Sequence, residues 1–257
     1  MAISARDGDP GSDQNVSPGG KHSGARKKNT SDEGGWGRAL KETVIIVVLA
    51  LVISAVVRAF LVQAFYVPSE SMENTLQVSD RIIASKITKN LSGVQRGEVV
   101  VFKDPGGWLP PAPEPAGGVR GAIRTALTFI GVLPSDSGQD LVKRVIAVGG
   151  DHIACCDAQG RIVLNGVALN ETYIKHAGSP DATNQVRFDV TVPDGYVFVM
   201  GDNRGNSRDS RYHLDYKDGG VPTDSVVGKV FVVVWPFARW AVVPIPEIFG
   251  NPALNAG

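Results

Sequence analysis

The order of apolar and polar residues divides the chain into a polar tail, one long apolar run and a region of short alternating runs. The tail, residues 1–40, is rich in Gly, Ser, Asp, Asn and Lys. Such a composition buries too little apolar surface to offset chain entropy, so we expect a disordered tail. Residues 43–62 follow with a single charge, Arg58, and these 20 residues match the length of a helix that crosses a bilayer. The pattern predicts one transmembrane helix within residues 41–64.

The charges that flank the apolar run predict its orientation. Basic residues precede it, among them Arg26, Lys27, Lys28, Arg38 and Lys41. The positive-inside rule therefore places the tail in the cytoplasm and the chain beyond residue 64 outside the membrane. A cleavable signal sequence is the competing interpretation, because Ala64 is a small residue of the kind that a cleavage site needs. The long preceding tail and the length of the apolar run favour an anchor.

Short runs rich in β-branched residues alternate with turn residues beyond the anchor. These runs lie at 81–84, 98–102, 141–148, 161–164, 186–192, 196–200 and 226–235. They are typical of strands, and Asn165-Gly166 after one of them favours a tight hairpin. We expect a mainly antiparallel β domain over residues 65–250, built as a partly open barrel or as folded sheets, followed by a C-terminal tail at 251–257.

Residues 104–140 interrupt the strand pattern with a Pro- and Gly-rich stretch and a short helical pattern behind it. We interpret them as a surface insertion between two strands. Trp108 and Phe129, with their apolar neighbours, are able to enter a bilayer interface, but packing back on their own domain is the commoner outcome for such side chains. The apolar residues 240–246 are too few and too broken by proline to cross a membrane, so the predicted topology is single-pass.

Charge and cysteine content exclude some classes of function. Lys plus Arg and Asp plus Glu both number 26, so the chain has no net charge and no basic surface for nucleic acid is expected. The two cysteines, Cys155 and Cys156, are adjacent and form no disulfide framework. They are either a vicinal disulfide or two free thiols. With His152 they resemble a metal cluster only superficially, because a fourth ligand is missing, so we expect no metal and no cofactor.

Two segments hold candidate catalytic side chains. Ser69 and Ser71 follow a proline soon after the predicted anchor, which alone is weak evidence. Lys143 and Arg144 lie in the predicted strand 141–148, so alternation sends them to opposite faces, and we expect one of them to point inward. A lysine in an apolar site has a lowered pKa and can take a proton from a serine hydroxyl, whereas an arginine cannot lose its charge. If either is a base, it is Lys143, although an exposed strand lysine is the commoner outcome.

A third segment, residues 201–211, combines Gly, Asp, Asn, Ser and Arg at high density. This composition suits a tight loop that is held by its own hydrogen bonds and ion pairs. On residue types alone, stabilising the loop is a sufficient role for its charged side chains, which include Asp202, Arg204, Asp209 and Arg211.

These three segments, together with residues 96–102, closely resemble the ordered motif set of bacterial type I signal peptidases, also called leader peptidases. The membrane segment, the serine box at 68–76, the strand at 96–102, the Lys143-Arg144 strand and the 201–211 loop occur in the family's order, from residue 43 to about 236. The resemblance implies a membrane-bound serine endopeptidase with the signal-peptidase type of β fold. Such an enzyme would use a Ser/Lys dyad to cleave N-terminal signal peptides from exported preproteins after an Ala-x-Ala site.

The resemblance also implies a role for each matching residue. Ser71 would attack the scissile carbonyl, Lys143 would be the general base, and Ser69 with the backbone N–H of Ser71 would form the oxyanion hole. Ser207 would hydrogen-bond and orient Lys143. The ion pairs that hold the loops would be Asp209 with Arg211 and Asp202 with Arg144. The residues that would line the substrate pockets are Phe65, Val67, Met72, Leu76 and Val142.

The sequence departs from the family pattern at three positions. Asn74 stands where proline is usual, Glu98 where aspartate is usual, and Gly149 where proline is frequent. Each residue keeps turn-forming or charged character. We therefore expect a change in local rigidity rather than a loss of activity.

The resemblance and the anchor together imply partners and a location. We expect preprotein signal peptides and membrane lipid as partners, the protein export machinery as a further candidate, and no nucleic acid. The expected location is the cell membrane, with the N-terminus in the cytoplasm and the β domain outside. Two alternatives stay open: a Ser/His/Asp hydrolase, for which His152, His176 and His213 are available but the G-x-S-x-G elbow is missing, and a membrane-tethered β domain that binds partners without catalysis.

Overall fold

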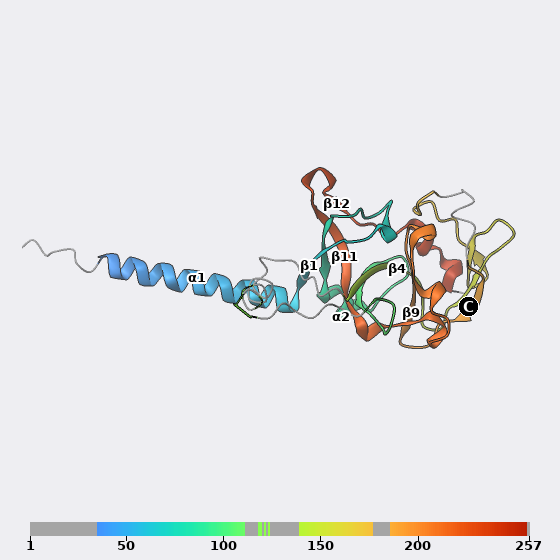
Figure 1. Cartoon of the computed structure of the whole chain (residues 1–257), viewed down its shortest axis with the longest axis horizontal. Coiled ribbons are helices and arrows are strands. Elements are labelled where there is room, and N and C mark those ends of the chain that lie inside the picture. Colours follow the sequence, from blue (N-terminus) through green and yellow to red (C-terminus); the bar gives the residue numbers. More distant parts are fainter. Residues whose placement is uncertain are drawn as a thin grey trace, which may run out of the picture. The chain divides into compact units, whose positions relative to one another are not determined.

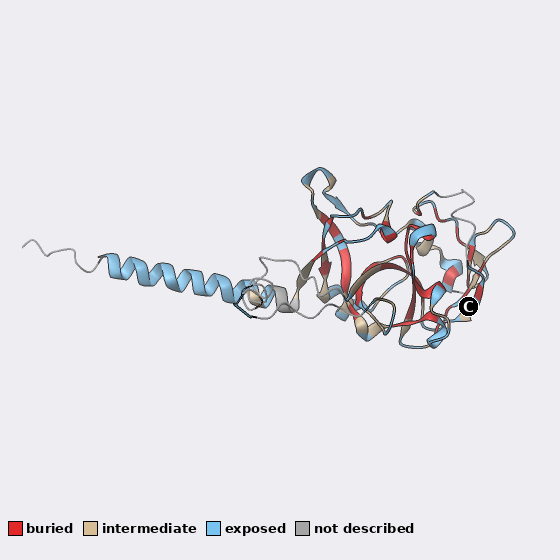
Figure 2. Cartoon of the chain, in the orientation of Figure 1, coloured by how far each residue is buried: buried red, intermediate tan, exposed pale blue. Residues whose placement is uncertain are grey.

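The structure is a computed structural model that describes residues 35–110, 118, 119, 121, 123, 139–176 and 186–255 (Figure 1). Most of the tail expected at 1–40 and the Phe129 region of the insertion lie outside these residues. The first described element is the helix α1, Gly35–Phe60, in which Trp36–Val57 is long and apolar enough to cross a membrane. The helix contains most of the predicted apolar run and begins before it. Its described apolar side chains are exposed (Figure 2).

A large antiparallel sheet follows α1, because the β-branched runs identified in the sequence pair with one another. Its eight strands run in the order β1-β2-β11-β3-β4-β9-β10, and β12 pairs with β11. Their bounds are Val62–Tyr66 (β1), Arg81–Ser85 (β2), Val99–Lys103 (β3), Asp140–Val148 (β4), Tyr196–Met200 (β9), Val221–Pro222 (β10), Val226–Trp235 (β11) and Ala241–Val242 (β12). Within the described residues, β1 and β10 stay at opposite ends of this order, so the sheet does not close into a barrel.

A second antiparallel sheet of four strands has the order β7-β6-β5-β8. Its strands are His152–Cys155 (β5), Ile162–Leu164 (β6), Val167–Ala168 (β7) and Phe188–Thr191 (β8). The hairpin between β6 and β7 turns through Asn165 and Gly166, whose φ angles of 50° and 79° are those that a two-residue turn of this kind requires. The structure confirms the mainly antiparallel β fold, built as folded sheets.

Short helices join the strands and close the domain. They are α2, Lys86–Ser92, and the 3-10 turns η1, Glu70–Met72; η2, Arg204–Asn206; η3, Ser210–Tyr212; η4, Lys217–Gly219; η5, Thr223–Ser225; η6, Phe237–Arg239; η7, Glu247–Gly250; and η8, Pro252–Asn255. Leu254 in η8 is fully buried in the core with Ile153 and Phe198. The packed domain therefore continues at least to Asn255, beyond the boundary that we expected at residue 250.

Apolar residues cover both faces of the large sheet at β3. Val99 and Val101 of β3 belong to one buried cluster, whereas Val100 and Phe102 belong to another. Figure 2 shows the buried residues gathered along these strands. A strand that is covered on both faces reads as a continuous apolar run, as β3 does. Its neighbour β4 is buried at consecutive positions too, although it carries Lys143 and Arg144. This double coverage decides the environment of the charged residues on β4.

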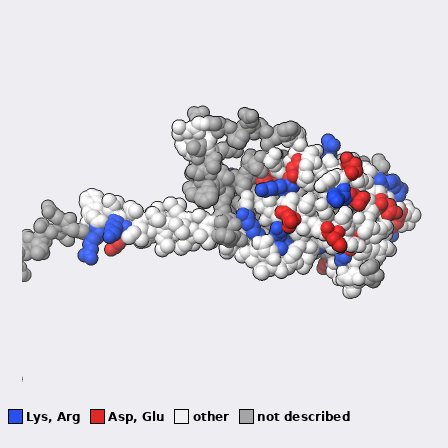
Figure 3. Space-filling model, turned by 90° about the horizontal axis from the view of Figure 1, so that it is seen from below, with Lys and Arg blue, Asp and Glu red and all other residues white. Residues whose placement is uncertain are grey.

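The described surface of the domain carries charges of both signs beside exposed apolar side chains. On the face seen in Figure 3, acidic and basic side chains are interspersed, without the basic stripe that nucleic-acid binders carry. Along α1, Arg38, Lys41 and Glu42 lie near the N-terminal end, and Arg58 lies in the last turn of the helix. Trp108 of the insertion stacks on His213 with ring centroids 4.4 Å apart and meets Phe102 edge-on, so this part of the insertion packs on its own domain.

Candidate active site

The turn that carries Ser71 follows β1 directly. Residues 69–76, which we call the serine turn, contain η1 and end in two backbone bonds from Thr75 and Leu76 to the Met72 carbonyl. Met72 and Leu76 are buried and anchor the turn in the core. The Ser71 carbonyl accepts a hydrogen bond from the backbone N–H of Asn203 at 3.0 Å. The backbone around Ser71 is therefore fixed from both sides.

Lys143 reaches Ser71 from the middle of β4. Its Nζ donates a hydrogen bond to Ser71 Oγ at 2.6 Å and a second one to the Val142 carbonyl at 3.0 Å. Only 3% of Lys143 and 8% of Ser71 are exposed. Burial lowers the pKa of Lys143 to about 8, against the carboxylates of Asp209 and Asp202, which raise it. Near neutral pH a useful fraction of this amine is uncharged, and an uncharged amine at this distance can accept the serine proton.

Both charged residues of β4 are buried, although we expected only one of them to point inward. Lys143 pairs with Val100 and Arg144 pairs with Val99, and these two valines belong to the clusters on the two faces of the sheet. Alternation does send the side chains to opposite faces. The expectation was wrong because both faces are covered, so Arg144 is only 1% exposed.

Ser69 stands at the start of the serine turn in an extended conformation, with φ −130° and ψ 160°. Its hydroxyl lies 3.3 Å from Ser71 Oγ, and its side chain is exposed. The structure thus places a second hydroxyl beside the first. Its expected role in an oxyanion hole stays a prediction.

The 201–211 loop packs directly against the serine turn. A Cβ on Gly201 would lie 2.4 Å from the Ser71 carbonyl oxygen and 2.3 Å from Ser207 Oγ, so only glycine fits here. The Gly201 N–H donates to Asp209 Oδ2 at 2.9 Å. Asn203 adds a side-chain bond to the Glu70 carbonyl at 3.0 Å. The loop therefore fixes the serine turn through its own backbone and through the Asn203 side chain.

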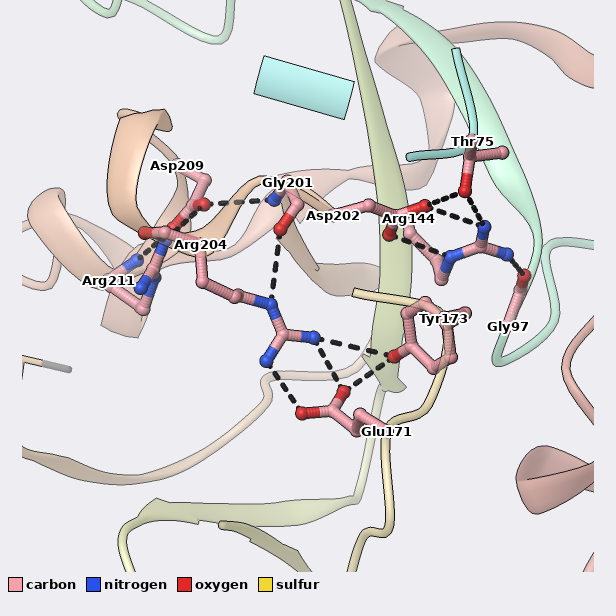
Figure 4. Close-up of polar contacts among 10 residues, drawn as sticks. All are labelled: Thr75, Gly97, Arg144, Glu171, Tyr173, Gly201, Asp202, Arg204, Asp209 and Arg211. Carbon is pink, nitrogen blue, oxygen red and sulfur yellow. Dashed lines mark hydrogen bonds and ion pairs between the residues drawn. The ribbon is translucent and has the colours of Figure 1, made fainter. Parts of the chain in front are cut away.

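Two buried ion pairs hold the loop (Figure 4). Arg144 donates to both oxygens of Asp202 at 2.9 and 2.7 Å, and also to the Gly97 carbonyl at 2.6 Å. Arg211 donates to both oxygens of Asp209, each at 2.8 Å. Burial works to raise the pKa of Asp209, but the Arg211 guanidinium outweighs it and the pKa lies below its ordinary value. The structure thus brings together both ion pairs that the family resemblance implies.

Ser207 differs from the arrangement that the family resemblance implies. It is buried, and its Oγ makes no hydrogen bond of ordinary geometry with a described residue, although it lies close enough to Asp209 to help lower the pKa of that carboxyl. The hydrogen bonds of Lys143 in the described part of the chain go to Ser71 and to Val142. The bond between Ser207 and Lys143 is therefore not formed in this structure, and the orienting role of Ser207 stays a prediction.

The five residues expected to line the substrate pockets form one apolar cluster. Its buried members include Phe65, Val67, Met72 and Leu76, and Val142 packs against them. Met72 also belongs to the serine turn, so the cluster adjoins Ser71. The structure brings these residues together, whereas their contact with substrate stays a prediction.

The sequence did not point to a third buried ion pair in this region. Glu171 accepts hydrogen bonds from both terminal nitrogens of Arg204, at 2.6 and 2.5 Å, and from the hydroxyl of Tyr173 at 2.5 Å. Arg204 lies in the 201–211 loop, but Glu171 and Tyr173 lie outside every motif that we identified. A glutamate and a tyrosine two positions apart carry no local sequence signal that distinguishes them from surface residues.

Among the described residues, His152 and His213 are not arranged as in a Ser/His/Asp hydrolase. His152 contacts Asp189 at 2.6 Å, and both side chains are exposed. His213 stacks on Trp108, and its buried Nε2 has no hydrogen-bond partner among the described residues. Cys155 and Cys156 are joined as a vicinal disulfide, one of the two states that the sequence left open.

Comparison with known proteins agrees with the motifs. Residues 40–235 match the family model described as "Signal peptidase, peptidase S26". The "Probable signal peptidase I" of Mycobacterium leprae is 39% identical over 232 residues, which cover 80% of this chain and 79% of that protein. The "Signal peptidase I" of Mycobacterium tuberculosis is 39% identical over 79% of this chain and 75% of its own. The "Probable signal peptidase I-2" of Synechocystis is 34% identical over 90% and 92%.

Proposed function

This chain belongs to the signal peptidase family, peptidase S26, as a signal peptidase I, and on that premise we propose that Ser71 and Lys143 are its catalytic dyad. The observation that carries the proposal is the 2.6 Å contact between Lys143 Nζ and Ser71 Oγ inside the domain. We further propose that the enzyme cleaves signal peptides of exported preproteins after an Ala-x-Ala site.

The first half of the reaction forms an acyl-enzyme. The uncharged Lys143 amine takes the proton of Ser71 Oγ while this oxygen attacks the scissile carbonyl carbon. The negative charge that develops on the carbonyl oxygen is stabilised by the Ser71 N–H and by the Ser69 hydroxyl, whose Oγ is 3.3 Å from Ser71 Oγ. When the tetrahedral intermediate collapses, the Lys143 ammonium gives its proton to the leaving amine of the mature protein.

The second half restores the enzyme. Lys143, again uncharged, takes a proton from a water molecule that attacks the ester carbonyl. The ester bond to Ser71 breaks, the serine oxygen regains a proton from the Lys143 ammonium, and the signal peptide leaves with a new carboxylic acid, which releases its proton to the solvent. No cofactor enters either half of this scheme.

The apolar cluster beside the serine turn supports the expected preference for small side chains. Phe65, Met72 and Val142 belong to one packed apolar cluster, and such a lining suits a small apolar side chain better than a charged one. The membrane anchor supports the choice of substrate. In our proposal α1 spans the cell membrane with Arg38 and Lys41 on the cytoplasmic side, so the β domain lies outside and meets cleavage sites that emerge from the bilayer.

The test is cleavage of a preprotein with an Ala-x-Ala site by the full-length enzyme in detergent or vesicles. We expect cleavage by the wild type, loss of cleavage in Ser71→Ala and in Lys143→Met, and no change in Lys103→Met, a lysine that is exposed on β3. Retention of the wild-type rate in Ser71→Ala would identify a binding domain without the proposed catalysis. Replacing the alanine before the cut with a bulky residue should abolish cleavage by the wild type.

A further inference from the structure

Tyr173 lies between β7 and β8, in a segment without any family motif, yet it touches the parts of the chain that form the active site. Its carbonyl accepts a hydrogen bond from Asn74 Nδ2 of the serine turn at 2.7 Å. Its ring lies under the guanidinium of Arg144 on β4, with 4.7 Å from Cζ to the ring centroid. Its hydroxyl donates to Glu171 at 2.5 Å.

The hydroxyl contact continues into the 201–211 loop. Glu171 holds Arg204 in a buried ion pair, in which the side chains are 5% and 0% exposed. Arg204 Nε in turn donates to the Gly201 carbonyl at 3.1 Å. Figure 4 shows this chain of contacts from the Tyr173 hydroxyl to Gly201. Gly201 in turn packs against the Ser71 carbonyl, so the chain of contacts continues to the backbone of Ser71.

The residues on either side of Tyr173 also bond to the serine turn and to the 201–211 loop. We call residues 171–175 the strap. At its far end the Lys175 N–H donates to the Asp202 carbonyl at 2.8 Å, and the Lys175 ammonium pairs with Glu73 of the serine turn. The strap therefore bonds to the serine turn and to the 201–211 loop at two points each, and through Tyr173 it covers Arg144, the neighbour of Lys143.

We infer that Tyr173 is a positioning residue of this enzyme: through its carbonyl, ring and hydroxyl it fixes the serine turn, β4 and the 201–211 loop relative to one another, and so sets the contact between Ser71 and Lys143. The inference rests on the proposed dyad. A general base works only within hydrogen-bond reach of its proton, and a displacement of about 1 Å is enough to cost about a hundredfold in rate.

The hydrogen bond that the Tyr173 hydroxyl donates is kept over the working pH range. Burial and the neighbouring Glu171 carboxylate raise the pKa of Tyr173 well above its ordinary value, so the hydroxyl keeps its proton and goes on donating. The hydroxyl also serves a buried carboxylate, which loses a charge-assisted bond if the hydroxyl is removed.

Two full-length variants separate this role from a contribution to stability. Tyr173→Phe keeps the ring under Arg144 and removes the hydroxyl. Asn74→Gly removes the amide that binds the Tyr173 carbonyl, while glycine adopts the φ of 89° found at this position without strain. Tyr216→Phe is the matched control, because Tyr216 is exposed on the same domain. Rates are expressed per folded enzyme and followed from about pH 5 to about pH 10, a range that brackets the ordinary pKa values of histidine and lysine.

We expect kcat to fall about tenfold in Tyr173→Phe and a few-fold in Asn74→Gly, with KM within about twofold of the wild type. We also expect the acid limb of the rate profile to move to higher pH, because water that enters a loosened site favours the charged form of Lys143. Loss of folded enzyme would lower the rate alike at every pH. Tyr216→Phe should match the wild type.

The inference is overturned if the acid limb of Tyr173→Phe coincides with that of Tyr216→Phe, whatever the rate. If Tyr173→Phe does not fold, Asn74→Gly decides by the same criterion. Ser71→Ala is assayed in parallel. Cleavage that survives in Ser71→Ala contradicts the proposed dyad, whereas loss of cleavage there with normal profiles in the other variants contradicts the role of Tyr173 alone.

Discussion

The carbonyl oxygen of Ser71 lies 2.4 Å from the place where Gly201 would carry a Cβ, so the candidate nucleophile and the 201–211 loop approach each other through bare backbone. Real Cβ contacts do not come this close, and the opposing atom belongs to the main chain, which cannot rotate away. A side chain at position 201 must therefore push the serine turn away from Lys143.

Gly201→Ala should therefore lower kcat about a hundredfold or more while the protein still folds. Gly250→Ala is the matched control, because a Cβ at Gly250 meets no atom within 4 Å. Cleavage rates and circular dichroism of both variants check the prediction. A Gly201→Ala enzyme with the wild-type rate would show that the serine turn is not held by this contact.

Asp202→Asn should be strongly destabilising, because it leaves the Arg144 guanidinium buried without a counter-charge. The expected loss in the free energy of unfolding is about 3–5 kcal/mol, measured by urea denaturation. Asp189→Asn is the control, since Asp189 pairs with His152 on the exposed surface and should change little. A loss in Asp202→Asn no larger than in the control would mean that Arg144 finds other partners or water.

Ser207→Ala separates a role in catalysis from a role in packing. Because Ser207 Oγ is buried near Asp209 but makes no hydrogen bond of ordinary geometry with a described residue, its removal should change the free energy of unfolding by less than about 1 kcal/mol. If Ser207 orients Lys143 during the reaction, kcat should nevertheless fall about tenfold or more. Full activity in Ser207→Ala would remove this residue from the mechanism.

Ser210→Ala should behave in the opposite way. Ser210 Oγ accepts a hydrogen bond from the backbone N–H of Val199 at 2.9 Å, and both groups are buried. Loss of this hydrogen bond in Ser210→Ala should lower the free energy of unfolding by about 1–3 kcal/mol and leave kcat per folded enzyme near the wild-type value. Urea denaturation and cleavage rates of the two serine variants, measured side by side, check both predictions.

The buried Lys143 also makes stability depend on pH. Its pKa is about 8 in the folded protein, against 10.5 for an exposed lysine, so between these values the unfolded chain binds one more proton than the folded one. Stability should then rise with pH over this window, and below about pH 8 it should stay at the lower level.

Lys143→Met should abolish that part of the pH dependence and stabilise the protein at neutral pH. The gain should be of the order of 3 kcal/mol or less, because the cost of charging a buried amine is removed. Thermal unfolding from about pH 7 to about pH 10.5 in the wild type and the variant measures it. A variant less stable than the wild type at neutral pH would mean that the lysine is held charged by its neighbours.

Local patterns in the sequence predicted most of the fold. The uncharged run before Arg58 identified the helix, the β-branched runs identified the strands, and Asn165-Gly166 identified a hairpin, because each of these signals depends on neighbouring residues only. The end of the domain was misplaced, since nothing near Leu254 shows that it packs against Phe198.

The site was predictable only as far as its motifs extend. Ser71 and Lys143 are 72 positions apart, and their meeting was inferred from the family resemblance, not from either residue's surroundings in the sequence. Tyr173 and Glu171 were missed because their partners come from distant segments. The burial of Arg144 was missed because alternation along β4 gives the direction of a side chain but not what covers that face.

The most direct test of the account is the pH dependence of kcat/KM for preprotein cleavage by the full-length enzyme, which reports the free enzyme's base. With Lys143 as that base, kcat/KM should fall about tenfold for each pH unit below about 8, since only the uncharged amine can accept the Ser71 proton. A profile that stays flat from about pH 5 to about pH 9, or one that falls only below about pH 6.5, as an ordinary histidine would require, would contradict it.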